Sequence, residues 1–498
     1  MTAYEQLQSH FEKIADLHHV QAIASWDEAS MMPAGGGEAR GRAMSTLSVV
    51  IHELVTQDNL PALINAAQAE SLAPWPAANL REIQRAVTQA TAVPAELVQR
   101  LGLVTSRCEQ AWRIHRANND WPAMLPLLEE VVAVSRERAA VLGAAKGCSA
   151  YDALLDEYEP GVTSATVDGV FADLKTFLPG FAAEVIARQA AEPVLPLTGD
   201  FSVEKQRALG IEVMTAMGFD FAHGRLDISH HPFCGGVPED VRITTRYNTD
   251  NFVQSLMGVI HETGHAMYEQ GLPAGWRNQP VGTALSSGTH ESQSLLMEMQ
   301  ACRTREFLQF LAPRAQRIFL GNESNDPAWG VDNLHRLYTR VERSYIRVDA
   351  DEVTYPLHVI LRYELEKQLI DGSLKVRDLP AAWDAKMREY LDVSTAGNFT
   401  DGCLQDVHWP AGLFGYFPTY TLGAMTAAQL FFAANAEIEG VPQAISQGQF
   451  ASLLGWLREH VHGKGSFLAY DDLMREATGS TLNASYFKNH LLQRYGAQ

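Results

Sequence analysis

The sequence has few of the features that mark nucleic-acid-binding, membrane or secreted proteins. Its formal net charge is −20 and no run of lysines and arginines stands out, which argues against nucleic acid or an anionic membrane surface as the main partner. No uninterrupted apolar run approaches membrane-spanning length, and residues 1–30 contain no apolar stretch after basic residues. We therefore expect neither a transmembrane segment nor a secretory signal.

Cysteine is also scarce. The five cysteines (Cys108, Cys148, Cys234, Cys302 and Cys403) are odd in number and scattered, without the paired spacing of a cysteine metal site. We read them as reduced thiols in a cytoplasmic protein. Internal repeats and low-complexity tracts are missing as well, so we expect an ordinary globular chain.

What the sequence does contain is helical periodicity along most of its length. Apolar residues recur at intervals of three and four, and one such pattern over 329–349 predicts a helix. Only 225–229 and 241–247 look like strands, and with the loop 232–236 between them they predict a small antiparallel hairpin. Residues 396–419 are rich in glycine and aromatics and lack periodicity, and such segments tend to be functional. The predicted fold class is therefore mainly α.

The most informative stretch is 257–269, which predicts a buried helix carrying two histidines and a carboxylate. His261 and His265 project from one face one turn apart, close enough to hold one metal ion. Glu262 lies beside them, about 100° around the axis. In this His-Glu-x-x-His arrangement the histidines bind zinc and the glutamate acts on a water molecule. The alternatives are a pair of surface histidines, which the apolar residues before them disfavour, and a buried pair satisfied by hydrogen bonds.

A catalytic zinc site needs a third protein ligand. In one class the motif extends to His-Glu-x-x-His-x-x-Gly-x-x-His, but this chain has Tyr268 and Gly271 where that pattern requires glycine and histidine. That class is excluded. We therefore expect a glutamate from a second helix, with Glu291 as the best candidate and Glu298 as the second. For either residue the alternative is a carboxylate stabilised by the start of its helix.

These residues resemble the carboxypeptidase Taq family of zinc metallocarboxypeptidases. The resemblance rests on 261–271 followed by 290–293, and on four more motifs in the order of the family: His231-Pro232-Phe233, Asp240-Val241-Arg242-Ile243-Thr244, Ile346-Arg347-Val348-Asp349-Ala350-Asp351 and Gly402-Cys403-Leu404-Gln405-Asp406-Val407-His408-Trp409. None of these motifs departs from the family pattern. The resemblance covers at least residues 26–420.

The resemblance implies a cytoplasmic, mostly helical enzyme, a single large body with a deep active-site cleft and a small antiparallel β element beside the zinc helix. It implies release of single amino acids from peptide C-termini, so the expected partners are peptides with a free C-terminus, and a homodimer is the usual assembly. We expect one domain over residues 1–498. Its N-terminal helical part (1–200) would cover the cleft, by analogy, and the remainder (201–498) would hold the zinc site.

By the same resemblance, His261, His265 and Glu291 hold one Zn²⁺ per chain, with Co²⁺ as an alternative metal. Glu262 acts as the general base. It takes a proton from the attacking water and passes it to the leaving amine.

A carboxypeptidase must also bind a free C-terminal carboxylate, and the planar fork of arginine can hold both oxygens. Arg347 lies in a family motif and off the apolar stripe of its predicted helix, so it is the first candidate. The alternative is an ion pair with Asp349 or Asp351. Arg242 is the second candidate, on a strand whose edge could pair with the substrate backbone. The alternative is a salt bridge with Asp240.

Peptide hydrolysis builds an oxyanion that needs a hydrogen-bond donor besides the metal. His408 and Tyr420 are the candidates, with Tyr416 in reserve, and resemblance to related helical zinc peptidases supports a histidine and a tyrosine from this region. Packing is the alternative for both tyrosines. His231 and His290 are candidate contacts of the substrate or of a metal ligand, with buried hydrogen-bonded histidines as the alternative.

Two other functions stay open from the sequence. An oligopeptidase that cuts internally would use the same zinc apparatus, with a difference only in how the cleft closes beyond the leaving residue. A zinc-containing peptide-binding scaffold without catalysis is disfavoured because Glu262 is intact.

Overall fold

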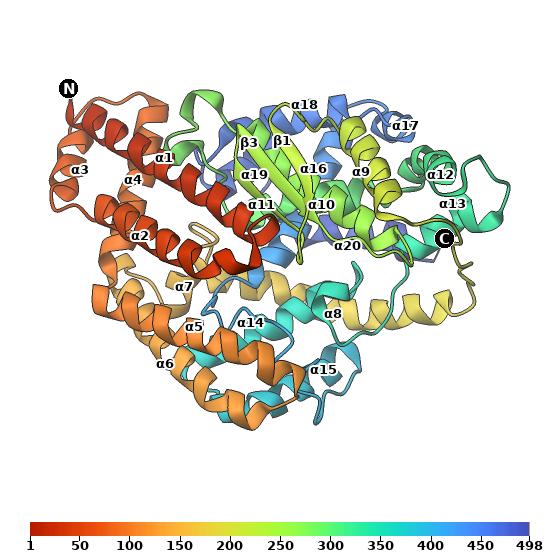
Figure 1. The fold of residues 1–498 in the computed structure, drawn as a ribbon, viewed down its shortest axis with the longest axis horizontal. Helices are drawn as coiled ribbons and strands as arrows, with labels where there is room; N and C mark the ends of the chain where they lie inside the picture. The colour runs from red at the N-terminus through yellow and green to blue at the C-terminus, as the bar shows by residue number, and fades with distance from the viewer. Residues whose placement is uncertain (498) are drawn as a thin grey trace. The chain divides into compact units, whose positions relative to one another are not determined.

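The computed structural model describes residues 1–497, which contain twenty α-helices and one three-stranded sheet (Figure 1). The helices are α1 (Ala3–Ser30), α2 (Gly37–Val55), α3 (Leu60–Gln68), α4 (Pro74–Ala92), α5 (Ala95–Ala117), α6 (Trp121–Lys146), α7 (Ala150–Leu155), α8 (Ser164–Gln189), α9 (Val203–Met217), α10 (Val253–Gly271), α11 (Ser287–Leu295), α12 (Arg305–Leu320), α13 (Val331–Tyr338), α14 (Tyr355–Asp371), α15 (Leu379–Leu391), α16 (Pro418–Glu437), α17 (Val441–Ser446), α18 (Ala451–His460), α19 (Tyr470–Thr478) and α20 (Ala484–Tyr495). The strands are β1 (Gly224–Ile228), β2 (Phe233–Val237) and β3 (Asp240–Thr245). The predicted mainly α class is confirmed. Among the described helices, none is long and apolar enough to cross a membrane.

The chain groups into two compact units that are interleaved in the sequence. Unit 1 comprises Met1–Ala90, Val194–Tyr338 and Gly423–Leu482, and unit 2 comprises Thr91–Pro193, Thr339–Leu422 and the residues from Asn483 onward. The two-histidine motif lies in unit 1, whereas the motifs at 346–351 and 402–409 lie in unit 2. The organisation as one domain, with its division at residue 200, stays a prediction.

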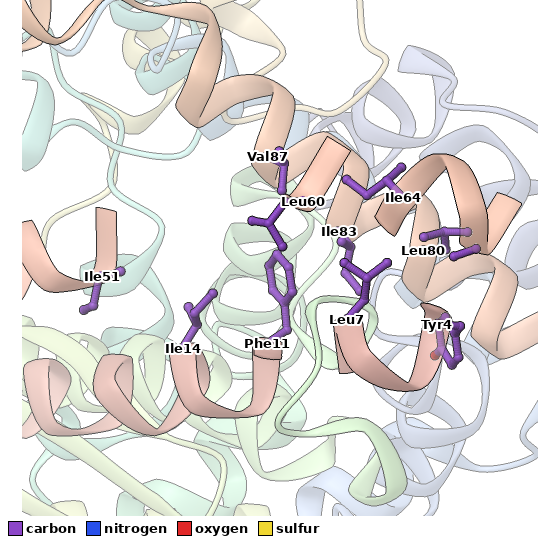
Figure 2. Packing of buried hydrophobic residues seen from close by; sticks show 11 residues of the cluster. Tyr4, Leu7, Phe11, Ile14, Ile51, Leu60, Ile64, Leu80, Ile83 and Val87 are labelled. Carbon is purple, nitrogen blue, oxygen red and sulfur yellow. The ribbon is translucent and has the colours of Figure 1, made fainter. Parts of the chain in front are cut away.

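A hydrophobic cluster in unit 1 joins α1 to the three helices that follow it (Figure 2). In α1 the buried residues Tyr4, Leu7, Phe11 and Ile14 recur at intervals of three and four, so they share one face. That face packs against buried residues of α2, α3 and α4, namely Ile51, Leu60, Ile64, Ala67, Leu80, Ile83 and Val87.

The small sheet has the strand order β1-β3-β2, with β3 in the centre. β3 pairs antiparallel with β2 and parallel with β1. The predicted antiparallel pairing of 225–229 with 241–247 is therefore wrong, because those two segments are parallel neighbours. The antiparallel partner of β3 is instead β2, whose pattern predicts a loop. The sequence pattern does not predict this strand because Gly235 and Gly236 interrupt the alternation of side chains that is typical of a strand.

Helix α10 packs on this sheet and presents its histidines on the opposite face. Val259 and Ala266 of α10 join Leu226, Val241 and Ile243 of the strands in one buried cluster. Val259 and Ala266 are two turns apart and so lie in line along the helix. His261 and His265 lie on the same helix, about 200° and 240° around its axis from Val259. Because the apolar face of α10 is buried against the sheet, His261 and His265 point away from the sheet.

The predicted helix over 329–349 is wrong beyond its first part, because α13 ends at Tyr338. The segment that follows is irregular up to α14, apart from a 3₁₀ turn at Arg347–Asp349. Side chains from elsewhere take up its backbone groups: Gln189 accepts from the N–H of Val341, and Gln405 accepts from the N–H of Arg347. These tertiary hydrogen bonds replace the intrahelical ones.

The segment between α15 and α16 is irregular, as the lack of periodicity predicts. Side chains of unit 2 hold it in place. The amide oxygen of Asn119 accepts from the backbone N–H of Phe399 and of Thr400, and the indole of Trp112 donates to the carbonyl of Leu404 at 2.7 Å. The loop is therefore a fixed structure, suited to carrying functional side chains.

Candidate functional site

His261 and His265 of α10 and Glu291 of α11 bring three metal-ligating groups together in unit 1. Their ligand atoms all lie within 4.8 Å of one another. Oε2 of Glu291 is 3.7 Å from Nε2 of His261 and 3.4 Å from Nε2 of His265. Ligand atoms at the corners of a tetrahedron with metal bonds of about 2.0–2.2 Å are roughly 3.3–3.6 Å apart. The two distances from Oε2 of Glu291 are therefore close to those between the ligand atoms of a tetrahedral zinc site.

Two glycines let the surrounding helices approach closely enough for this arrangement. A Cβ on Gly264 of α10 would lie 2.5 Å from the carbonyl oxygen of Gln293 and 2.6 Å from Cα of Ser294, both in α11. A Cβ on Gly423 of α16 would lie 2.9 Å from Cβ and Cγ of Glu291. Gly264, inside the two-histidine motif, thus allows α11 to approach α10 closely enough to bring Glu291 beside the histidines.

The second candidate ligand, Glu298, lies on the outer side of His261. Its Oε2 accepts a hydrogen bond from Nδ1 of His261 at 2.9 Å, and its Oε1 accepts from Nη2 of Arg303 at 2.6 Å. It sits in a π-helical stretch, Leu296–Ala301, that continues α11. A carboxylate on Nδ1 fixes the ring and leaves Nε2 free to face a metal ion, so Glu298 is placed to orient His261.

His290 plays the corresponding part for His265. Nδ1 of His290 lies 2.5 Å from Nδ1 of His265, and Nε2 of His290 lies 2.8 Å from Oε1 of Glu269. The carboxylate of Glu269 requires the proton of His290 on Nε2, so Nδ1 of His290 accepts from Nδ1–H of His265. This tautomer leaves the lone pair of His265 on Nε2, directed at Glu291. His290 therefore contacts His265, a candidate metal ligand, and its role at a metal site stays a prediction.

Glu262 and Glu291 are two buried carboxylates beside the same histidines, and their surroundings affect them differently. Burial raises the pKa of Glu262 to about 7, with His261 opposing the shift and Glu291 adding to it. Burial also acts on Glu291, but His261 and His265 outweigh it and hold the pKa of Glu291 below its usual value. Glu262 can thus readily exchange a proton near neutral pH, whereas Glu291 stays ionised.

Arg347 forms the centre of a second cluster, in unit 2, and is only 4% exposed. Its Nε and Nη2 donate to Oδ1 of Asp406 at 3.2 and 3.0 Å, and its Nη1 donates to the hydroxyl of Tyr355 at 2.6 Å. Within residues 1–497, its carboxylate partner is Asp406. The alternative ion pair with Asp349 or Asp351 is therefore not formed.

His408, Tyr416 and Tyr420 lie together in unit 2. Nε2 of His408 is 3.2 Å from the hydroxyl of Tyr420, and the ring centroid of Tyr416 is 5.6 Å from that of His408. The guanidinium of Arg347 stands 4.8 Å from the ring centroid of Tyr420. Burial lowers the pKa of His408 to about 4, against the attraction of Asp406. The imidazole is therefore neutral at neutral pH and can donate one N–H.

Arg242 and His231 belong to the small sheet in unit 1. Arg242 donates to Asp240 through Nε at 3.0 Å and Nη2 at 2.7 Å, and its guanidinium covers the ring of Trp26 at 4.4 Å. Because β3 is paired along both edges, the prediction that the strand of Arg242 offers an edge to the substrate backbone is wrong. The cause is the additional strand β2. His231 lies just before β2, and its backbone oxygen accepts from the hydroxyl of Ser229.

Some residues of the two clusters carry no sequence signal strong enough to predict them. Glu269 follows His265 by one helical turn, but its contact with His290, like that of Arg303 with Glu298, depends on how the chain folds. Arg362 of α14 is different, because it directly follows the mostly apolar run 357–361. A charge that is buried with such residues requires a partner, and this could have drawn attention to it.

Comparisons with known proteins identify relatives along nearly the whole chain. Residues 6–495 match the family described as carboxypeptidase Taq (M32) metallopeptidase. The chain is 38% identical to thermostable carboxypeptidase 1 of Thermus thermophilus, over 99% of this chain and 98% of that protein. It is 33% identical to carboxypeptidase 1 of Bacillus subtilis, over 96% and 95%. Among solved structures it is similar to metallocarboxypeptidase 1 of Trypanosoma cruzi, with a TM-score of 0.97, 44% identity and 99% of each chain covered. The M32 carboxypeptidase of Deinococcus radiodurans gives a TM-score of 0.93, with 34% identity and 99% of each chain covered.

Proposed function

Because this chain belongs to the carboxypeptidase Taq (M32) metallopeptidase family and is a metallocarboxypeptidase, we propose that it releases single amino acids from peptide C-termini at one zinc ion. The ligands are His261, His265 and Glu291. The observation that carries the proposal is the convergence of three ligand atoms within 4.8 Å, while both Nδ1 atoms are occupied by other partners. Two imidazoles and a carboxylate are a donor set typical of catalytic zinc, with a fourth position left open.

A zinc ion bound here would polarise the carbonyl group of the scissile bond and lower the pKa of a water molecule. Glu262 takes the proton of the attacking water as general base and passes it to the leaving amine. Nε2–H of His408 and the hydroxyl of Tyr420 donate hydrogen bonds to the oxyanion. Their separation of 3.2 Å is compatible with both groups reaching one oxygen atom.

We assign the C-terminal carboxylate of the substrate to Arg347. A guanidinium has five N–H groups, and Asp406 and Tyr355 together accept from three of them, on Nε, Nη2 and Nη1. The remaining two N–H groups lie one on each terminal nitrogen. They can donate to the two oxygens of a single carboxylate, which is the geometry that favours arginine for this task.

The other predicted substrate contacts have less support. Tyr416 packs beside His408 and stays a predicted contact, as does His231. Arg242 is already paired with Asp240, which favours a structural role for it. The homodimer, the cytoplasmic location, the cleft covered by residues 1–200 and the use of Co²⁺ also stay predictions.

One pair of peptides tests the proposed function. The metal-loaded enzyme is incubated with a peptide that has a free C-terminal carboxylate and with the same peptide as a C-terminal amide. We expect release of free amino acids, one at a time, from the first peptide only, and loss of this release after treatment with a chelator. Equal cleavage of both peptides would indicate an oligopeptidase, and cleavage of neither would indicate a peptide-binding scaffold.

A further inference from the structure

In unit 2, Asp406 lies between two buried arginines. Its Oδ1 accepts from Nε and Nη2 of Arg347, and its Oδ2 accepts from Nε of Arg362 at 2.6 Å. Arg362 belongs to α14 and is 0% exposed. Its Nη1 donates to the carbonyl of His358 one turn earlier on the same helix at 2.6 Å, which fixes the direction of the guanidinium.

The charges of this cluster do not cancel. The two arginines contribute two positive charges, and Asp406 is the carboxylate within ion-pair distance of either one in residues 1–497. Burial acts to raise the pKa of Asp406, but Arg362 and Arg347 outweigh it and hold it far below its usual value. Burial and the same arginines lower the pKa of His358, and His408 is neutral as well. The cluster therefore carries one surplus positive charge.

Stability does not explain a second arginine in this position. Nη2 of Arg362 is buried without a hydrogen-bond partner, and its guanidinium lies against the ring of Trp383 at 4.6 Å. Removing such a group from water costs free energy that one shared carboxylate offsets only in part. Replacing a buried ion pair by apolar residues is often neutral or stabilising. The presence of Arg362 at this buried position therefore points to a requirement of function.

That requirement follows from the pairing of Arg347. With Asp406 alone, Arg347 would form a neutral ion pair, and a neutral pair attracts a carboxylate only weakly. Arg362 offsets the negative charge of Asp406, so the positive charge of Arg347 remains available to a substrate carboxylate. We propose that Arg362 is a positioning residue for substrate recognition, which maintains the surplus positive charge with which Arg347 binds the C-terminal carboxylate of a peptide. This inference rests on the proposed role of Arg347.

The test compares a single and a double variant of the metal-loaded enzyme, with KM for a peptide that has a free C-terminus as the readout. Arg362→Gln leaves a neutral Arg347–Asp406 pair, and we expect KM to rise about 10- to 100-fold, the value of one charge-assisted hydrogen bond or slightly more. Arg362→Gln/Asp406→Asn restores the surplus charge, and we expect it to recover at least about tenfold of that loss. A merely structural role predicts that the double variant is at least as impaired as the single one.

Arg100→Gln is the control, because Arg100 of α5 pairs with Glu137 of α6 in the same unit and both side chains are about half exposed. We expect it to leave KM unchanged. If Arg362→Gln does not fold, Arg362→Lys carries the test, since lysine keeps the charge but cannot make the two directed hydrogen bonds from Nε and Nη1. We then expect KM within about threefold of that of the wild type, and a rise beyond about tenfold would overturn the proposal.

Arg347→Gln, measured in parallel, separates this inference from the function on which it rests. If Arg347→Gln leaves KM unchanged, the assignment of the substrate carboxylate to Arg347 fails. If Arg347→Gln raises KM while Arg362→Gln does not, or while the double variant shows no recovery, only the inference about Arg362 fails. Circular dichroism and the unfolding midpoint of every variant confirm that the compared proteins are folded.

Discussion

Nδ1 of His261 donates to Oε2 of Glu298 at 2.9 Å, and this bond determines which nitrogen of the imidazole faces Glu291. Glu298 is itself held by Arg303 through its other oxygen. Burial acts to raise the pKa of Glu298, but Arg303 and His261 outweigh it and lower it, so the carboxylate stays ionised and can only accept. His261 and His265, the two candidate metal ligands of α10, are thus oriented from outside the candidate site, His261 by Glu298 and His265 by His290.

We expect Glu298→Gln to weaken metal binding by about 10- to 100-fold, because the amide is a poorer acceptor and orients His261 less firmly. The measurement is the metal content of the protein at equilibrium with graded concentrations of a competing chelator. Turnover of the fully loaded variant should change much less than its affinity for metal. If Glu298 were the third ligand, the loss of metal would instead resemble that caused by Glu291→Gln.

Glu262→Gln should keep the metal and lose catalysis. The amide cannot accept a proton from water, and general-base catalysis contributes about 10²–10⁴-fold, so we expect turnover to fall by at least this factor. Metal content and turnover are measured on the same preparation, so that loss of the ion cannot account for the result. Undiminished turnover in a fully loaded Glu262→Gln variant would remove Glu262 from the role of general base.

The candidate metal site could be predicted from the sequence because helix geometry determines where residues at a given spacing lie. His261 and His265 are four residues apart, so any regular helix brings them to one face. Their hydrogen-bond partners on Nδ1, Glu298 and His290, could not be predicted in this way. Contact of Glu298 with Nδ1 of His261 depends on how closely α10 and α11 approach, and on the π-helical turn that carries Glu298, neither of which leaves a periodic signal.

The surroundings of Arg347 show the limit of the same reasoning. The motif identified the residue, but the apolar pattern around it predicted a helix that the structure does not have. Its segment is held by Gln189 and Gln405, which come from distant parts of the chain and replace the helical hydrogen bonds. Intrinsic helix preference is too weak to resist such contacts. The pairing with Asp406 likewise exists only once the chain is folded.

A pH-dependent contribution to stability is expected from Glu366 of α14. This fully buried carboxylate accepts from the hydroxyl of Tyr151, the indole of Trp409 at 3.1 Å and the N–H of Gly415 at 3.2 Å. Burial raises its pKa from 4.5 to about 7, with these hydrogen bonds opposing the shift. The folded protein therefore holds this proton more tightly than the unfolded chain does. The resulting stabilisation is fully present below about pH 4.5 and is lost as the pH rises through about 7.

The corresponding measurement is urea-induced unfolding of the wild type and of Glu366→Gln between about pH 4.5 and pH 8. The free energy of unfolding of the wild type, relative to that of the variant, should fall by roughly 3 kcal/mol across this range. Other groups titrate in both proteins and cancel in the difference. A difference that does not vary with pH would show that Glu366 ionises normally in the folded state.

Two of the three glycines of α10 give a matched pair of substitutions that tests how Glu291 is placed. Gly264→Ala would put a Cβ 2.5 Å from the carbonyl oxygen of Gln293, so α11 must shift. We expect a loss of about 1–3 kcal/mol in the free energy of unfolding, together with weaker metal binding because Glu291 moves with α11.

Gly258→Ala is the control, since the nearest atom to its Cβ would be Oγ1 of Thr245 at 4.0 Å. It should leave metal binding unchanged and stabilise the helix by up to about 1 kcal/mol. Equal effects of the two substitutions on metal affinity would mean that the approach of α11 to Gly264 does not set the position of Glu291.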